Sequence, residues 1–140
     1  MKVSLKRVNG DYGFVGMGKS GDPIAVGDVS LDGVSGASPM ELLLMSIGAC
    51  SAVDIVSILN KQRQQISNYA MEVSGERHEI AQAKPFKSAH VKVILEGEIK
   101  PEKAKKAAAL SFDKYCSVSL TLEPQVPVTY SIEVNGVMVD

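Results

Sequence analysis

The stretch SPMELLLMSIGAC, residues 38–50, decides the fold. Ser38 stands at the cap position of a helix, Pro39 at the first helical position and Glu41 at the third. Serine and glutamate at this spacing satisfy each other's free backbone amides, and proline already has the backbone angle of a first helical turn. The pattern predicts a long helix from Pro39 to about Gln62. Apolar or small residues surround its first four turns, which predicts burial on every side.

The whole chain has 140 residues, a formal net charge of -1, 45% hydrophobic and 22% charged residues. This length and composition predict one globular domain, residues 1–140, with a core large enough to be stable without crosslinks. A nucleic-acid-binding protein needs an excess of cations, so the charge argues against that class. The longest uncharged apolar run, Leu42–Val53, is shorter than a membrane-crossing helix requires, and we expect no membrane association.

Strand patterns lie on both sides of the predicted helix. Asn9-Gly10 is the dipeptide of a two-residue hairpin turn, and the segment from Asp28 to Ser38 is loop-like. Two strands and a second helix follow, and a strand ends the chain. Two helices among runs of strands indicate an α+β fold with mostly antiparallel sheets. The expected strands are about 3–8, 11–17, 23–26, 69–79, 87–98 and 126–134, and the second helix is Pro101 to about Lys114.

The long apolar helix also predicts an oligomer. A chain of 140 residues has few other elements to cover such a helix, so a second copy should cover it. We therefore expect an obligate homodimer.

Cys50 and Cys116 are the two cysteines of the chain. No secretory signal precedes them, so a reducing cytoplasm and free thiols are expected. Taken singly, each cysteine is most simply a small buried core residue. Asp54 lies one helical turn after Cys50 on the same face, where an ionised carboxylate requires either solvent or a cation.

Arg77 is the candidate cation. It shares strand parity with Met71 and Val73, which predicts an inward guanidinium, paired with Asp54, with a Cys50 thiolate or with a structural acid. Glu41 is most simply the capping residue. The two histidines are far apart in alternating strands, and neither a metal cluster nor a phosphate-binding loop is present, so no metal and no cofactor are expected.

Three motifs together resemble the OsmC/Ohr family, and within it the YhfA-like branch. They are SPMELLL to GAC at residues 38–50, GER at 75–77 and KYCSV at 114–118, and the resemblance extends from about Val3 to Gly136. It implies an OsmC-like α+β fold in which sheets wrap around long central helices of an intertwined homodimer.

The same resemblance implies thiol-dependent reduction of small organic hydroperoxides. Cys50 would be the peroxidatic thiol and Cys116 the resolving thiol, with an external dithiol reducing their disulfide. The acid of the characterised peroxidases directly follows the helix-opening proline, where this chain has Met40, so Glu41 stands one position later. The characterised peroxidases also use an arginine of the N-terminal segment beside the thiolate. In this chain Arg77 is the candidate substitute for it. The alternative is a binding or structural protein of the same fold without significant peroxidase activity. Apolar residues of the helix would line a substrate pocket, namely Leu43, Leu44, Met45 and Ile47.

Overall fold

The computed structural model describes residues 1–28 and 35–140, which form two compact units, Met1–Leu43 and Leu44–Asp140. Most of the loop expected between Asp28 and Ser38 lies outside the described residues. That residues 1–140 act as a single domain stays a prediction.

The first unit holds a three-stranded antiparallel sheet in the order β1-β2-β3. The expected hairpin between β1 and β2 is present, but its connection is not the predicted two-residue turn. Asn9 pairs with Gly13 after a register shift, and among residues 9–12 only Gly10 has positive φ, at 55°. The loop therefore has three residues, which fits a bulged hairpin. The strands are β1 (Ser4–Asn9), β2 (Gly13–Met17) and β3 (Pro23–Val26).

Helix α2 (Pro39–Lys61) begins at the predicted residue and ends one residue before the predicted end. Ile47, Ile55 and Leu59 belong to the core of the second unit, and each is at most 1% exposed. The opposite side carries exposed apolar side chains, including Val53, which is 71% exposed. Burial on every side is thus wrong within the second unit, because the sheet and the crossover of this unit pack on one face of α2 only. By length and composition alone α2 is long and apolar enough to cross a membrane, a criterion that the core helices of soluble proteins also meet.

The second unit contains a four-stranded sheet in the order β4-β5-β6-β7. Strands β4 and β5 form a long antiparallel hairpin, whereas β6 pairs parallel to β5 after a helical crossover. Four of the five strand pairings in the described chain are antiparallel, so the expected α+β class is confirmed. The strands are β4 (Gln65–Arg77), β5 (Phe86–Glu98), β6 (Val128–Val134) and β7 (Val137–Val139).

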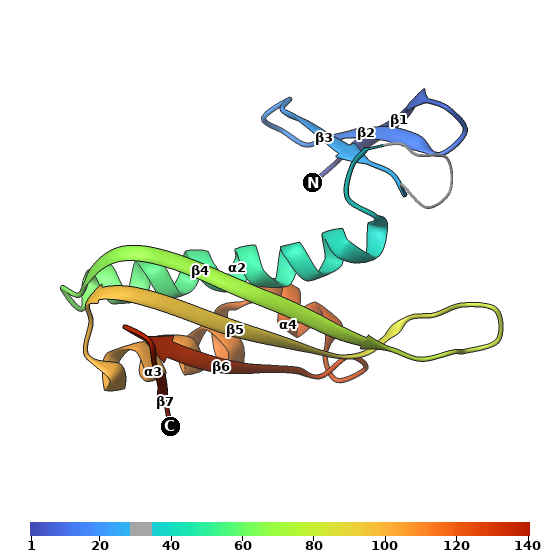
Figure 1. The fold of residues 1–140 in the computed structure, drawn as a ribbon. Helices are drawn as coiled ribbons and strands as arrows, with labels where there is room; N and C mark the ends of the chain where they lie inside the picture. Colours follow the sequence, from blue (N-terminus) through green and yellow to red (C-terminus); the bar gives the residue numbers. More distant parts are fainter. Residues whose placement is uncertain (29–34) are drawn as a thin grey trace. The chain divides into compact units, whose positions relative to one another are not determined.

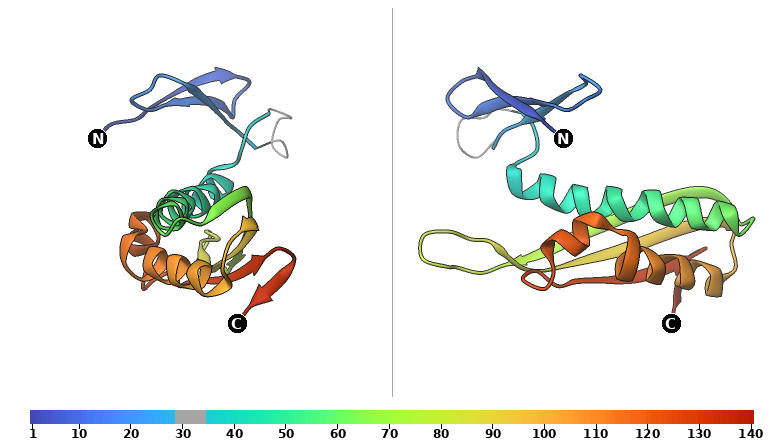
Figure 2. Two further views of the ribbon diagram at one scale, coloured as in Figure 1. Left: turned by 90° about the vertical axis from the view of Figure 1, so that its left-hand side faces the viewer. Right: turned by 180° about the vertical axis from the view of Figure 1, so that it is seen from behind.

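The crossover consists of α3 (Pro101–Leu110), a short π-helix η1 (Ser111–Tyr115) and α4 (Ser117–Leu122). These elements and the second-unit part of α2 cover the same face of the sheet (Figures 1 and 2). Val91, Val93 and Leu95 of β5 point into the core between the two layers. Phe112 of η1 stacks on Tyr130 of β6, with ring centroids 4.6 Å apart.

Gly48 permits the closest approach between α2 and the sheet. A Cβ atom at this position would lie 2.6 Å from Met71 Sδ and 3.0 Å from Val73 Cγ2. Such distances are shorter than carbon atoms tolerate without movement of a neighbour. Glycine therefore sets the depth at which α2 lies against β4, two residues before Cys50.

Candidate functional site

The start of α2 is built as its sequence predicts. The Ser38 amide donates to Glu41 Oε2 at 2.7 Å, and the Glu41 amide donates to Ser38 Oγ at 3.2 Å. These reciprocal bonds are the predicted capping box. Glu41 thus has a structural task at the helix start.

Cys50 and Cys116 lie side by side, although they come from elements far apart in the sequence. Cys50 is a partly buried residue of α2, and Cys116 is a fully buried residue between η1 and α4. Both are free thiols. They are close enough for the Cys50 side chain to act on Cys116 by hydrogen bonding and by charge. The two thiols are therefore neighbours, as the family resemblance implies.

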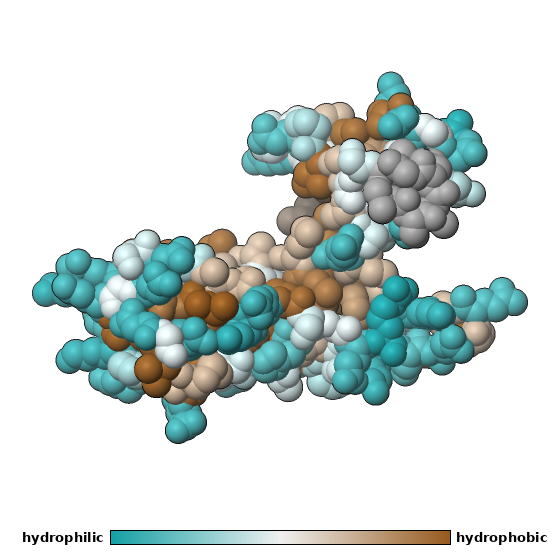
Figure 3. Space-filling model, in the orientation of Figure 1, coloured by the Kyte–Doolittle hydropathy of each residue, from teal (hydrophilic) through white to brown (hydrophobic). Residues whose placement is uncertain are grey.

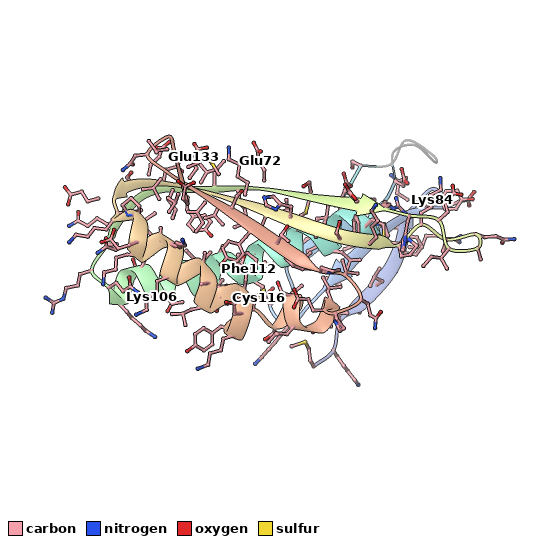
Figure 4. The ribbon with its side chains drawn as sticks, turned by 90° about the horizontal axis from the view of Figure 1, so that it is seen from below. Glu72, Lys84, Lys106, Phe112, Cys116 and Glu133 are labelled. Atoms are coloured by element: carbon pink, nitrogen blue, oxygen red, sulfur yellow. The ribbon has the colours of Figure 1, made fainter. Side chains whose placement is uncertain are left out.

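The π-helix places Cys116. Its wider turn ends where the Cys116 amide donates to the Ser111 carbonyl oxygen at 2.7 Å, and the backbone then becomes extended at Cys116. Single π-turns inserted into helices occur frequently at functional sites. Figure 4 shows Phe112 and Cys116 on the helix-covered side of the sheet, and Glu72 and Glu133 on its opposite face.

The surroundings of Cys116 favour the neutral thiol. Burial raises the pKa of Cys116 above its ordinary value, and the neighbouring Cys50 raises it further. Hydrogen bonding from Ser119 acts in the opposite direction, and its hydroxyl donates to Cys116 Sγ at 3.1 Å. Burial is the largest contribution, so the net pKa is raised.

Asp54 pairs with a hydroxyl group and not with the expected cation. Ser111 Oγ donates to Asp54 Oδ2 at 3.1 Å, and the Ser51 carbonyl oxygen lies 3.5 Å from the same hydroxyl. This contact joins α2, one turn after Cys50, to the first residue of the π-helix. It connects the two elements that carry the thiols.

The expectation that the Arg77 guanidinium points inward is wrong for the single chain. It is exposed at the end of β4, where its Nε donates to the Lys84 carbonyl oxygen of the β4–β5 connection at 2.6 Å. The sheet register shifts between Glu76 and Arg77, so the alternation that placed Met71 and Val73 inward does not continue to Arg77. No ion pair of Arg77 with Asp54 occurs in the described part of the chain.

The serines of this region were not predicted from the sequence. Ser51, Ser111 and Ser119 are the fully buried polar residues among those described, each at most 1% exposed, and all three adjoin the cysteine-bearing segments. Their positions give a usable signal, since each lies in a helical segment within five residues of a cysteine. Small polar residues in a core require hydrogen-bond partners, so such a group of serines draws attention to the segments that they join.

An open cavity of about 510 Å³ lies between α2 and the π-helix. It borders the thiol region through Asp54, one turn after Cys50, and Tyr115, which precedes Cys116. The expected apolar residues Leu43, Leu44, Met45 and Ile47 do not line it. Ile47 lies in the core, whereas Met45 is exposed. The lining residues are Asp54, Ser57, Ile58, Lys61, Leu110 and Tyr115.

No group of three potential metal ligands occurs among residues 1–28 and 35–140. His90 is satisfied by two hydroxyl groups, Thr129 Oγ1 at 2.8 Å and Ser131 Oγ at 3.0 Å. The polar side chains described at the site are those of the two thiols, the serines around them and Asp54.

The chain thus combines an α+β fold with a partly buried thiol on its long helix and a second, fully buried thiol beside it. The chain belongs to the OsmC-like protein family, whose pattern matches residues 32–131. Protein YhfA of Escherichia coli (strain K12) is 40% identical over 138 residues, which cover 96% of this chain and 98% of that protein.

Solved structures with the same fold include proteins named for hydroperoxide resistance. The OsmC-like protein from Mycoplasma pneumoniae has a TM-score of 0.80 at 14% identity, with 95% of each chain covered. The organic hydroperoxide resistance protein OhrB of Bacillus subtilis has a TM-score of 0.63 at 17% identity, with 96% of each chain covered. At these identities the likeness concerns the fold.

Proposed function

We propose that this protein is a thiol-dependent reductase of small organic hydroperoxides, with Cys50 as the peroxidatic thiol and Cys116 as the resolving thiol. The observation that carries the proposal is the contact between the two free thiols in an OsmC-like fold. Their different burial supports the assignment of roles. A hydroperoxide must reach the first thiol, and Cys50 is the more accessible one.

The reaction proceeds in two steps. The Cys50 thiolate attacks the outer peroxide oxygen, the O–O bond breaks, and the alcohol leaves, so that Cys50 becomes a sulfenic acid. The Cys116 thiolate then attacks the Cys50 sulfur, and water leaves as the disulfide forms. An external dithiol returns both cysteines to thiols, which requires a reducing compartment, and we propose the cytoplasm.

A homodimer is part of the proposal. Met45, Ala49 and Val53 are exposed on α2 at intervals of four residues and so form one apolar stripe. Apolar side chains are also exposed at the surface of both units (Figure 3). A second copy of α2, packed against the stripe, would remove this apolar area from water. The proposal needs no cofactor, metal, nucleic acid or membrane.

Stopped-flow mixing with cumene hydroperoxide tests the activity. We expect the reduced protein to consume one peroxide for each pair of thiols lost. Cys50→Ser should abolish the reaction. Cys116→Ser should still react once but form a sulfenic acid and no intramolecular disulfide.

The second candidate function is a binding or structural role for the same fold. It is favoured by the complete burial of Cys116 and by the raised pKa of this thiol, which slow thiol chemistry. If the wild-type protein reacts with cumene hydroperoxide no faster than Cys50→Ser does, the peroxidase proposal is wrong and this role remains.

A further inference from the structure

The hydroxyl of Ser119 is aimed at a sulfur atom. It donates to Cys116 Sγ at 3.1 Å inside the core, where Cys116 is 0% and Ser119 is 1% exposed. The other two buried serines bond to oxygen. Ser51 donates to the Gly48 carbonyl oxygen at 2.9 Å, and Ser111 donates to Asp54. Ser119 is thus distinguished from them by its sulfur partner.

We propose that Ser119 is the positioning residue of Cys116, because its hydroxyl holds Sγ beside Cys50 and stabilises the Cys116 thiolate by donating a hydrogen bond. The inference rests on the proposed function, in which Cys116 acts as a thiolate. A hydrogen bond to an ionised acceptor is about twice as strong as one between neutral groups, so the contact favours the thiolate over the thiol.

The thiolate is needed at two points of the proposed cycle. In the resolving step the Cys116 thiolate attacks the Cys50 sulfenic sulfur, an S–S bond forms, and the S–O bond breaks. The leaving hydroxide takes up a proton and becomes water. Without the Ser119 hydroxyl, the Cys116 thiol would ionise with greater difficulty, because burial opposes the charged form and only the Ser119 backbone would still act in the other direction.

The thiolate reappears when the external dithiol reduces the disulfide. One thiolate of the dithiol attacks Cys50 Sγ, the more accessible sulfur, and the electron pair of the broken S–S bond goes to Cys116 Sγ. The second thiol of the dithiol then attacks the mixed disulfide. Cys50 leaves as a thiolate, and the dithiol is oxidised to its own disulfide. Ser119 therefore stabilises the leaving group of the first exchange.

The test measures the ionisation of Cys116 directly. In a Cys50→Ser background the chain has one cysteine, so the pH dependence of thiolate absorbance at 240 nm reports Cys116 alone, after subtraction of the variant that lacks both cysteines. The substitution also removes the ionisable neighbour of Cys116. Absorbance requires no reagent to enter the core.

We expect Ser119→Ala in this background to raise the pKa of Cys116, which lowers the thiolate fraction at a given pH about tenfold. Ser119→Thr keeps the hydroxyl and should restore most of the ionisation. Ser117→Ala is the matched control, because Ser117 lies in the same helix but is exposed. If the Ser119→Ala variant folds and its Cys116 has the same pKa as in the Cys50→Ser protein that retains Ser119, the inference is wrong.

A second measurement uses both cysteines. Ser119→Ala should leave the first oxidation of Cys50 by cumene hydroperoxide unchanged, slow disulfide formation about tenfold, and increase the sulfenic acid that dimedone traps. An unchanged rate of disulfide formation would also overturn the inference. Should the protein not react with the peroxide at all, the proposed function fails, whereas the titration still decides the role of Ser119.

Discussion

Arg77 and Glu41 show how the surroundings of a single residue decide its task. Both were candidates for the activating groups of a thiolate. Glu41 is engaged in the reciprocal capping bonds with Ser38. Arg77 is exposed and bonds to the Lys84 carbonyl oxygen.

We predict that Arg77→Met leaves the rate of the first oxidation of Cys50 by cumene hydroperoxide unchanged. An exposed guanidinium that bonds to a backbone carbonyl in the β4–β5 connection is screened by water and contributes little to the activation of a thiol. Stopped-flow mixing of the Cys116→Ser variant, with and without Arg77→Met, measures this rate. Lys87→Met is the control, since Lys87 is an exposed cation of the same hairpin, 3.0 Å from Glu76. A slower oxidation in Arg77→Met alone would contradict the prediction and return Arg77 to the site.

Tyr69 offers a second prediction at the level of one residue. Its hydroxyl oxygen is buried and has no hydrogen-bond partner among the described residues, and burial raises the pKa of Tyr69 well above its usual value. An unpaired buried hydroxyl destabilises the fold. Tyr69→Phe should therefore increase the free energy of unfolding by about 1 kcal/mol at neutral pH.

The pH dependence of this effect has a defined sign. Because the folded-state pKa of Tyr69 is raised, the wild-type chain loses stability as the pH rises above the unfolded value of about 10. Tyr69→Phe lacks this loss, so its advantage should grow in alkali. Urea unfolding at neutral pH and above pH 10 measures both effects, with the exposed Tyr115→Phe as control. An advantage that stays constant or shrinks in alkali would refute the argument.

At the scale of elements, the contact between Asp54 and Ser111 joins the two segments that carry the cysteines. Asp54 belongs to α2, and Ser111 opens the π-helix whose last turn holds the Cys116 amide. The register of these segments determines whether a disulfide can form, since bridged Cα atoms must lie within about 7 Å.

We predict that Asp54→Ala and Ser111→Ala each destabilise the reduced protein by about 1 kcal/mol, a modest value because Asp54 is only partly buried. The double variant should lose less than the sum, because both substitutions remove the same hydrogen bond. Asp54→Asn retains an acceptor and should lose less than Asp54→Ala. Urea unfolding gives the values, and Ser57→Ala, exposed on the same helix, should be neutral. Strictly additive losses would show that the contact contributes nothing.

At the scale of the whole molecule, the exposed apolar stripe of α2 is the feature that a single chain leaves unexplained. Val53 is 71% and Met45 is 56% exposed, although both lie on α2, whose opposite face packs into the core of the second unit. Apolar surface of this kind on a helix marks a contact with another protein surface.

We predict that the wild-type protein sediments as a dimer at micromolar concentration and that Val53→Glu shifts it to a monomer. A carboxylate on the stripe would have to lose its hydration when two copies of α2 pack together. Val137→Glu is the matched control, because Val137 is 68% exposed on β7, away from the stripe. A stable folded wild-type monomer, or a Val53→Glu protein that remains dimeric, would contradict this arrangement.

The two Asn-Gly dipeptides of the chain show that a local sequence pattern predicts a turn but does not by itself determine the length of the loop. At Asn135-Gly136 both residues have positive φ, 51° and 81°, and a two-residue turn joins β6 to β7. The Asn135 side chain also bonds to the amide and carbonyl of Gly97 in the neighbouring hairpin. At Asn9-Gly10 a register shift adds a residue to the loop. The same dipeptide thus gives two outcomes, because strand register depends on pairing over several residues.

The sequence by itself determined the helix from Pro39, most strand positions, the α+β class and the two cysteines as the reactive candidates. These features follow from caps, periodicity and residue type, which act over a few neighbouring residues. The family resemblance implied that Cys116 meets Cys50, but no local pattern did. Tertiary structure alone decided that Ser119 bonds to Cys116, that β6 runs parallel to β5, and that Arg77 turns outward. Each of these depends on contacts between residues distant in the chain, and no local preference specifies which distant segments pack together.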